Sequence, residues 1–256
     1  MIGILAVALL VSSSGSAVEL QQQAASRLEV IMEETFSGIT GHLKEGSPVD
    51  EQGVRASVAA AFARDGLVSD EPPLVAVGIH SADPGWDGSG NLPIRKGDFL
   101  LLELSAREDT PGALYADLTW VAFAGSARQI PPRIQKVWGM VREARDHALA
   151  ELKAHPHAPG GSIDDAARMV VVKHNHGPWF PHATGHSLGE KDRGDGPNLQ
   201  RGETRTLEDG QCVTVEPGIY YPAEFGVRSG VDVCIGEDGA RVSGKLLQRE
   251  IRALLE

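Results

Sequence analysis

Three stretches in the second half of the chain decide how it is interpreted: HATGHSLG at residues 182–189, VEPGIY at 215–220 and EFGVR at 224–228. The first stretch holds two histidines four residues apart beside glycines, and the second places a glutamate at the end of an apolar run. A lone histidine is usually structural, whereas two at this spacing with an embedded carboxylate more often mark a site. Imidazole and carboxylate groups together suit Zn, Mn, Fe or Co.

Two further carboxylates stand inside apolar runs upstream. Glu103 lies in FLLLEL at residues 99–104, and Asp117 lies in ALYADLTW at residues 113–120. A buried carboxylate without a partner costs several kcal/mol or takes up a proton. We therefore expect Glu103, Asp117 and Glu216 to have partners that stabilise their charge, and a metal ion is one candidate. The alternative is that each carboxylate lies at a solvated strand end or pairs with an arginine.

Hydrophobic periodicity predicts helices and strands in separate blocks, which favours an α+β protein over strict βαβ alternation. A capping box at Ser16–Glu19 begins the first helix, which runs to Gly46, and Ser47-Pro48 starts a second. A third helix follows Pro131-Pro132, and a capping box at Ser162–Asp165 opens a fourth. The predicted strands are Leu74–Ile79, Phe99–Ala106, Ala113–Phe123, Cys212–Tyr220 and Gly226–Ile235.

The bulk composition limits the partners. The chain has 256 residues, 41% hydrophobic residues and a formal charge of −11. An acidic surface repels phosphate backbones and anionic lipid, so neither nucleic acid nor a membrane is an expected partner. A small-molecule or short-peptide substrate is the default. The only two cysteines, Cys212 and Cys234, predict buried reduced thiols.

The N-terminus allows two interpretations. Residues 2–11 are apolar and small residues follow, but ten residues cannot span a bilayer. If this segment is a signal, the protein is exported, although a signal peptide normally has a basic start, which is missing here. Otherwise residues 1–16 form an apolar N-terminal segment of a cytoplasmic protein. Residues 17–256 are predicted to form a single catalytic-type domain.

These motifs together resemble those of the pita-bread metallopeptidases, the creatinase/aminopeptidase family. HATGHSLG is similar to its HGTGHGIG signature, and EPGIY and EFGVR match two others. KGDFLLLE at residues 96–103 and YADLTW at residues 115–120 resemble the upstream segments, in the right order. The layout is most similar to the catalytic domain of Xaa-Pro peptidases such as aminopeptidase P and prolidase. The resemblance implies a curved antiparallel sheet with pseudo-twofold halves and helices on its outer face.

The resemblance also implies a metal site. The family holds two divalent metals with two Asp, one His and two Glu. Those positions fall here on Glu103, Asp117, His186, Glu216 and, for the bridging Glu, Gly230, which offers no ligand atom. The second metal site is therefore expected to be weak or empty. Asp232 lies two residues further, on the same strand face, and could approach the site.

Other family positions imply substrate contacts. His182 is kept and would line the site, and Arg228 is another candidate. A family histidine seven residues after the ligand His186 is replaced by Arg193, which could bind an anionic group or stand in for a metal's charge. The alternative is a solvated loop arginine, but the alignment of Arg193 with a functional position of the family favours a site role. A further family histidine falls on a glycine, which leaves the nearby His80 as a stand-in.

Three functions remain open. The first is a hydrolase of a C–N bond in a small peptide-like substrate, with one metal (Mn, Co, Fe or Zn) at Asp117, His186 and Glu216 and with Glu103 as base. The second is a metal-free, creatinase-like enzyme for a small zwitterion, in which His182 or His186 moves protons. The third is a non-catalytic binding protein. The resemblance also suggests a homodimer.

Overall fold

The computed structural model describes residues 16–256, so the predicted N-terminal segment lies almost wholly outside the described residues. The helices are α1 (Ala17–Glu45), α2 (Glu51–Arg64), α3 (Pro132–Ala154) and α4 (Gly160–Lys173), with 3₁₀ turns η1 (Gly78–Ala82), η2 (Ala127–Gln129) and η3 (Gly177–Trp179). The strands are β1 (Leu67–Val68), β2 (Leu74–Val77), β3 (Phe99–Glu108), β4 (Ala116–Phe123), β5 (Ser187–Leu188), β6 (Cys212–Val215), β7 (Gly218–Tyr221), β8 (Phe225–Arg228), β9 (Val231–Gly236), β10 (Gly239–Val242) and β11 (Arg252–Ala253).

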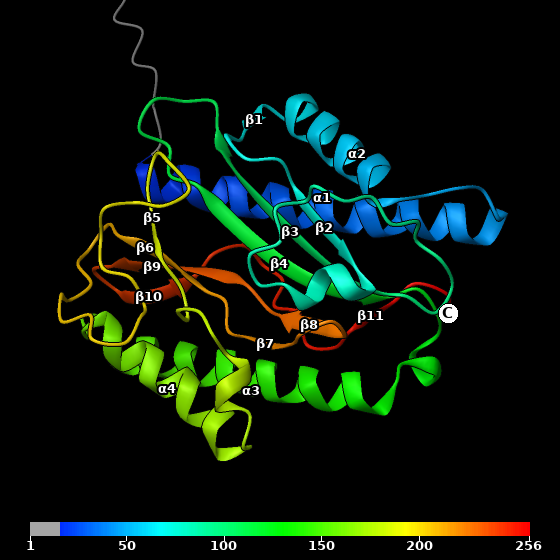
Figure 1. Ribbon diagram of the computed structural model, residues 1–256. Coiled ribbons are helices and arrows are strands. Elements are labelled where there is room, and N and C mark those ends of the chain that lie inside the picture. Colours follow the sequence, from blue (N-terminus) through cyan, green and yellow to red (C-terminus); the bar gives the residue numbers. More distant parts are fainter. Residues whose placement is uncertain (1–15) are drawn as a thin grey trace, which may run out of the picture.

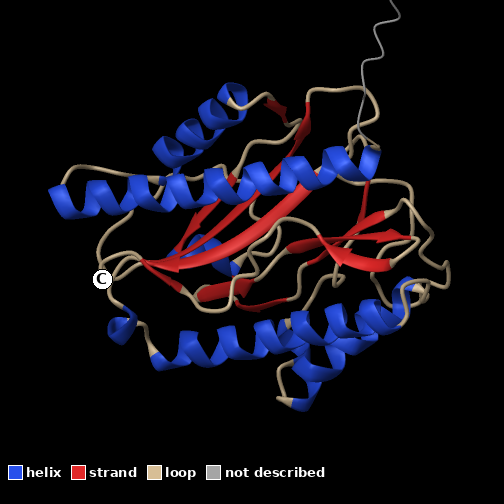
Figure 2. Ribbon diagram, turned by 180° about the vertical axis from the view of Figure 1, so that it is seen from behind, coloured by secondary structure: helices blue, strands red, loops and turns tan. Residues whose placement is uncertain are grey.

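The strands lie between two pairs of helices, with α1 and α2 on one side and α3 and α4 on the other (Figure 1). Seen from behind, α1 crosses the long strands of the first sheet, and α3 runs along the opposite side of the strand layer (Figure 2). One apolar core fills the space between α1, α2 and the first sheet. A second core joins α3 and α4 to β3 and β4 and to the later strands β6 to β9.

The strands form three hydrogen-bonded sheets. The first has the order β1-β3-β4-β11, with β2 also pairing to β3; the second has the order β10-β9-β6-β5; and β7 pairs with β8. All pairs are antiparallel except β11 with β4. A bridge between Thr119 of β4 and Gly230 joins the first sheet to the second. The observed blocks of helices and strands confirm the predicted α+β class.

The structure divides two of the predicted strands. The run Cys212–Tyr220 separates into β6 and β7 at Glu216-Pro217, and the run Gly226–Ile235 separates into β8 and β9 at Ser229-Gly230. Pro217 has no N–H to give to a ladder. Its carbonyl accepts a hydrogen bond from the Ser229 N–H, while Gly230 pairs with Thr119 instead. Both interruptions therefore fall where the first sheet meets the second.

Two predicted helix starts are also wrong. The helix α2 begins at Glu51, because Asp50 accepts a hydrogen bond from the Gly53 N–H at 2.8 Å and caps it. The helix α4 begins at Gly160, before the predicted capping box. The free N–H groups of its first turn bind the carbonyls of a distant loop at residues 203–205. The capping box that begins α1 at Ser16 is confirmed.

The prediction of reduced cysteines is wrong: Cys212 and Cys234 form a disulfide. They face each other directly across β6 and β9 in the strand register. That register brings the two Cα atoms to 4.0 Å, and it could not be deduced from the spacing of two cysteines. Among residues 16–256, no helix is long and apolar enough to cross a membrane.

Candidate active site

Strand register brings the two upstream carboxylates to one face of the first sheet. In the β3–β4 pair, Ser105 lies opposite Asp117, and Glu103 lies opposite Thr119. Residues two apart on a strand project to the same face. Glu103, Ser105 and Asp117 therefore share one face, and a ligand atom of Glu216 lies within 4.8 Å of ligand atoms of both Glu103 and Asp117.

His186 reaches this cluster from the segment just before β5. Gly185 allows the close approach, because a Cβ at that position would lie 1.8 Å from the Thr214 carbonyl oxygen. The Thr214 hydroxyl then accepts a hydrogen bond from the His186 N–H at 3.0 Å. His186 Nδ1 lies 3.1 Å from the Ser187 carbonyl, so Nδ1 carries the proton. This leaves Nε2 as an acceptor, 3.8 Å from a Glu216 oxygen.

Asp117 is the most constrained member of the cluster. It is 4% exposed, and its Oδ1 has no hydrogen-bond partner among residues 16–256. Burial raises its pKa well above the ordinary value, the charges of Glu216, Asp192 and Asp232 raise it further, and Arg193 lowers it. Its backbone N–H donates to Asp232 Oδ2 at 2.8 Å.

Glu216 is also held in its protonated form. Burial raises its pKa to about 8, and the charge of Asp192 raises it further, while Arg193 and a hydrogen bond from Thr214 lower it. His186 has the opposite tendency, because burial lowers its pKa and keeps the imidazole neutral. A metal ion requires a neutral imidazole, which His186 provides, and ionised carboxylates, so metal binding would release the proton that Glu216 holds.

Glu103 differs from the other carboxylates because it has a cation beside it. Arg228 at the end of β8 forms an ion pair with it, and Arg228 is itself buried. Burial lowers the pKa of Arg228 to about 10, so the guanidinium stays charged at neutral pH. The glycine at the missing ligand position is tightly packed: a Cβ on Gly230 would lie 2.8 Å from the Thr119 hydroxyl.

A pocket of about 550 Å³ opens beside the cluster. Glu103, Arg228, Arg193 and Trp86 are among its lining residues. Arg193 is exposed, yet its charge reaches Asp117 and Glu216. The structure therefore brings Glu103, Arg193 and Arg228 to one cavity at the edge of the ligand cluster.

The two remaining candidates lie outside that cavity. His182 contacts the Tyr220 hydroxyl at 2.9 Å and lines a separate pocket with Phe180 and Arg168. His80 lies in η1, where Nδ1 is 2.8 Å from the fully buried Glu51. Its ring stacks on Trp86, which does line the main pocket. His80 is thus connected to the pocket through Trp86.

Comparison with known proteins shows the family of the chain. Residues 19–237 match metallopeptidase family M24. The chain belongs to metallopeptidase family M24. It is 31% identical over 202 residues to the "Putative dipeptidase YkvY" of Bacillus subtilis, a match that covers 78% of this chain and 52% of that protein.

Solved structures give the same family and the pita-bread fold. An X-Pro aminopeptidase from Thermotoga maritima superposes with a TM-score of 0.79 at 25% identity, covering 93% of this chain and 63% of the other. A Xaa-Pro dipeptidase from Bacillus anthracis superposes with a TM-score of 0.78 at 26% identity, covering 93% and 62%. This M24 chain spans about half the length of the curated relatives it matches.

Sequence reasoning missed two residues of this cluster. Asp192 offers a ligand atom within 4.8 Å of ligand atoms of Asp117 and His186, and Ser105 donates a hydrogen bond to it. Ser105 had a signal, since it stands two residues after Glu103 on a strand. Asp192 had none, because the polar loop at residues 190–193 looks like any solvated loop.

Proposed function

We propose that this chain is a hydrolase that cleaves a peptide or amide C–N bond in a short peptide-like substrate, with one divalent metal instead of two. Membership of the M24 family supports the reaction class, and the dipeptidase and X-Pro aminopeptidase among its structural neighbours support a small substrate. The observation that carries the proposal is the buried Asp117 Oδ1, which lacks a hydrogen-bond partner among the described residues beside His186 and Glu216.

The residues fit one metal better than two. Asp117, His186 and Glu216 provide one imidazole and two carboxylates, a ligand set that suits Mn, Co, Fe or Zn. On the other side, Glu103 is already paired with Arg228, and Gly230 packs against Thr119 without a ligand atom. A guanidinium thus supplies positive charge where the family's second metal would be expected. When bound, the single metal would act as a Lewis acid toward water and the scissile carbonyl.

The chain's own residues would bind the substrate and move its protons. Glu103 lines the pocket beside the ligand cluster and is placed to accept a proton as general base. Arg193 lines the same pocket and could bind a substrate carboxylate through two parallel hydrogen bonds. Burial lowers the pKa of His182 and keeps its imidazole neutral. Its contact with the Tyr220 hydroxyl would hold Tyr220 in place near Glu216.

A metal-free enzyme for a small zwitterion is the second candidate. It is favoured by the two arginines, Arg193 and Arg228, because they already place positive charge among the carboxylates. Such a site would bind a substrate carboxylate at Arg193 and an amino group at Glu103 and Glu216. A non-catalytic binding protein is the remaining alternative.

Metal content separates these functions. The purified protein would be measured by inductively coupled plasma mass spectrometry after dialysis with and without Mn²⁺ or Co²⁺, in parallel with hydrolysis of Xaa-Pro dipeptides. About one metal per chain, with metal-dependent cleavage, is the expected result. Two metals per chain would contradict the single-metal site. Ligand binding without any metal would favour the second candidate, and binding without turnover would favour the third.

The assembly and the location also stay proposals. A homodimer follows from the family resemblance only. The sequence favours a cytoplasmic protein, whereas disulfides persist mainly in oxidising compartments, so the Cys212–Cys234 bond favours the exported alternative. Cell fractionation with an antibody to the protein would decide between the two locations.

A further inference from the structure

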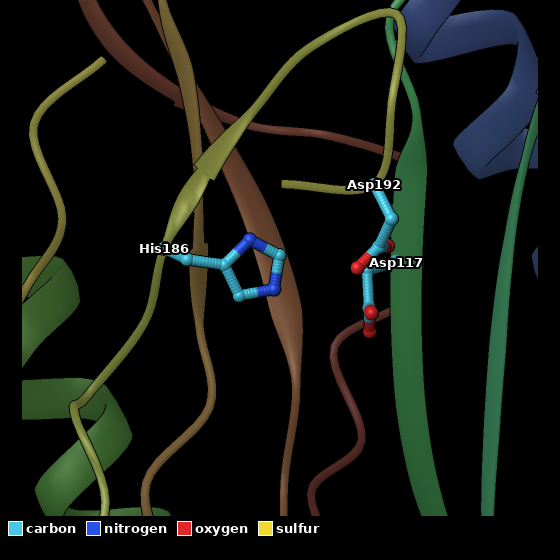
Figure 3. A group of neighbouring side chains, drawn as sticks. All are labelled: Asp117, His186 and Asp192. Atoms are coloured by element: carbon cyan, nitrogen blue, oxygen red, sulfur yellow. The ribbon is translucent and has the colours of Figure 1, made fainter. Parts of the chain in front are cut away.

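The loop that follows β5 brings a carboxylate to the cluster that the family pattern does not include. Asp117 from β4, His186 from before β5 and Asp192 from the loop after β5 each offer one ligand atom, all within 4.8 Å of one another. Figure 3 shows the three side chains: the His186 ring points toward the two carboxylates, which lie close to each other. Asp117 thus belongs to two ligand groups, one with Asp192 and one with Glu216.

The loop is folded back tightly to make this approach. The Gly194 N–H donates to the Ser187 carbonyl at 2.8 Å, and the Gly189 N–H donates to the Lys191 carbonyl at 3.1 Å. A Cβ on Gly194 would lie 2.7 Å from the Leu188 carbonyl, so only glycine fits there without a shift. Asp192 lies in this turn and is half-buried, unlike its exposed neighbours Lys191 and Arg193.

Ser105 holds the Asp192 carboxylate in place. Its hydroxyl donates a hydrogen bond to Asp192 Oδ1, and its backbone lies directly opposite Asp117 in the β3–β4 register. Hydrogen bonds of this kind orient ligand carboxylates in metal sites, and their loss typically weakens metal binding by about 10–100-fold.

A second observation, beside the closeness of the three side chains, is a buried oxygen without a partner. Asp117 is 96% buried, and its Oδ1 has no hydrogen-bond partner within residues 16–256. Two ionised carboxylates this close repel each other, so either one of them holds a proton or a cation lies between them. Arg193 is exposed, and within the described turn at residues 189–194 it is Asp192 that adds a ligand atom next to His186.

We propose that Asp192 is a metal ligand of this chain, together with Asp117 and His186, and that Ser105 is its positioning residue. The inference rests on the proposed one-metal function and names the carboxylate that compensates for the ligand lost at Gly230. The replacement comes from the loop after β5, next to His186, instead of from the segment between β8 and β9.

The test is Mn²⁺ and Co²⁺ binding to the full chain, by isothermal titration calorimetry and by the visible absorption of bound Co²⁺. Asp192→Asn is expected to weaken affinity by at least about tenfold and to change the Co²⁺ spectrum, because one ligand carries less charge. Ser105→Ala should weaken affinity by a similar factor, and Ser105→Thr, which keeps the hydroxyl, should restore it. Asp195→Asn is the matched control, since it removes the same charge from an exposed position of the same loop.

The outcomes separate this inference from the function on which it rests. Loss of binding in His186→Ala with unchanged affinity and spectrum in Asp192→Asn would overturn the inference and leave the one-metal function standing. If Asp192→Asn and Asp195→Asn weaken metal affinity equally, the effect comes from net charge alone, and this result would also overturn the inference. Absence of binding to the unmodified chain would overturn both. Thermal unfolding of each variant checks that the fold is intact.

Discussion

Gly230 offers the sharpest test of how the two sheets meet. It exchanges two backbone hydrogen bonds with Thr119, at 3.0 and 3.2 Å, and so joins β4 to the segment before β9. In Gly230→Ala the new Cβ would lie 2.8 Å from the Thr119 hydroxyl and 3.0 Å from its Cβ. Thr119 is 0% exposed, so its side chain is enclosed by neighbouring atoms and any movement has to occur inside the core. The alanine should therefore strain the pairing of Thr119 with residue 230, which connects β4 to the segment before β9.

The expected cost follows from that overpacking. Inserting a methyl group into a filled site typically destabilises a protein by about 1–3 kcal/mol. For a chain of this size each kcal/mol lowers the melting temperature by about 2–4 °C, which gives a decrease of about 2–12 °C. Gly38→Ala is the matched control, because its Cβ meets nothing within 4 Å on a helix, where alanine should stabilise by about 0.5–1 kcal/mol.

Urea unfolding followed by circular dichroism would measure both variants, and a double-mutant cycle with Thr119→Gly would measure their coupling. Gly230→Ala should cost less when Thr119→Gly has already removed the clashing side chain, with a coupling of about 0.5–3 kcal/mol. A melting temperature unchanged by Gly230→Ala, or additive effects in the cycle, would refute the argument that Thr119 excludes a side chain at this position.

Three further predictions concern the site and the second sheet. In the metal-free protein, burial raises the Glu216 pKa from 4.5 to about 8, so the folded state binds this proton more tightly than the unfolded state. The Glu216 contribution to stability should therefore fall as pH rises from about 4.5 to 8 and level off above. Glu216→Gln should make the slope of stability against pH in urea titrations shallower, although Asp117, whose pKa is also raised, keeps part of it. An unchanged slope would exclude Glu216 as a source. Reducing the Cys212–Cys234 bond, which spans 22 residues, should cost about 3 kcal/mol, and equal unfolding midpoints with and without reductant would contradict this. Gly230→Glu combined with Arg193→His should add a second metal per chain and Xaa-Pro peptidase activity, and the contact of the new side chain with Thr119 should lower the stability. Metal content and dipeptide hydrolysis would measure these effects, and one metal per chain with no gain in activity would contradict the prediction.

The sequence by itself determined the class and the family of this protein. Apolar periodicity gave the long helices, because an amphipathic stripe records which side of a helix is buried. The signatures around His186, Glu216 and Arg228 identified the M24 family, since their residue types and spacing follow from the chemistry. The sequence also marked Gly230 and Arg193 as departures, because a missing ligand atom is visible without coordinates.

Only the tertiary structure decided how these residues meet. The Cys212–Cys234 bond depends on strand register, and the Glu103–Arg228 ion pair depends on the packing of β8 against β3. Asp192 joined the cluster for the same reason: a tight turn after β5 and one hydroxyl on β3 place it beside Asp117. Periodicity encodes the side of an element that is buried, but contacts between residues far apart in the chain are fixed only when the elements pack.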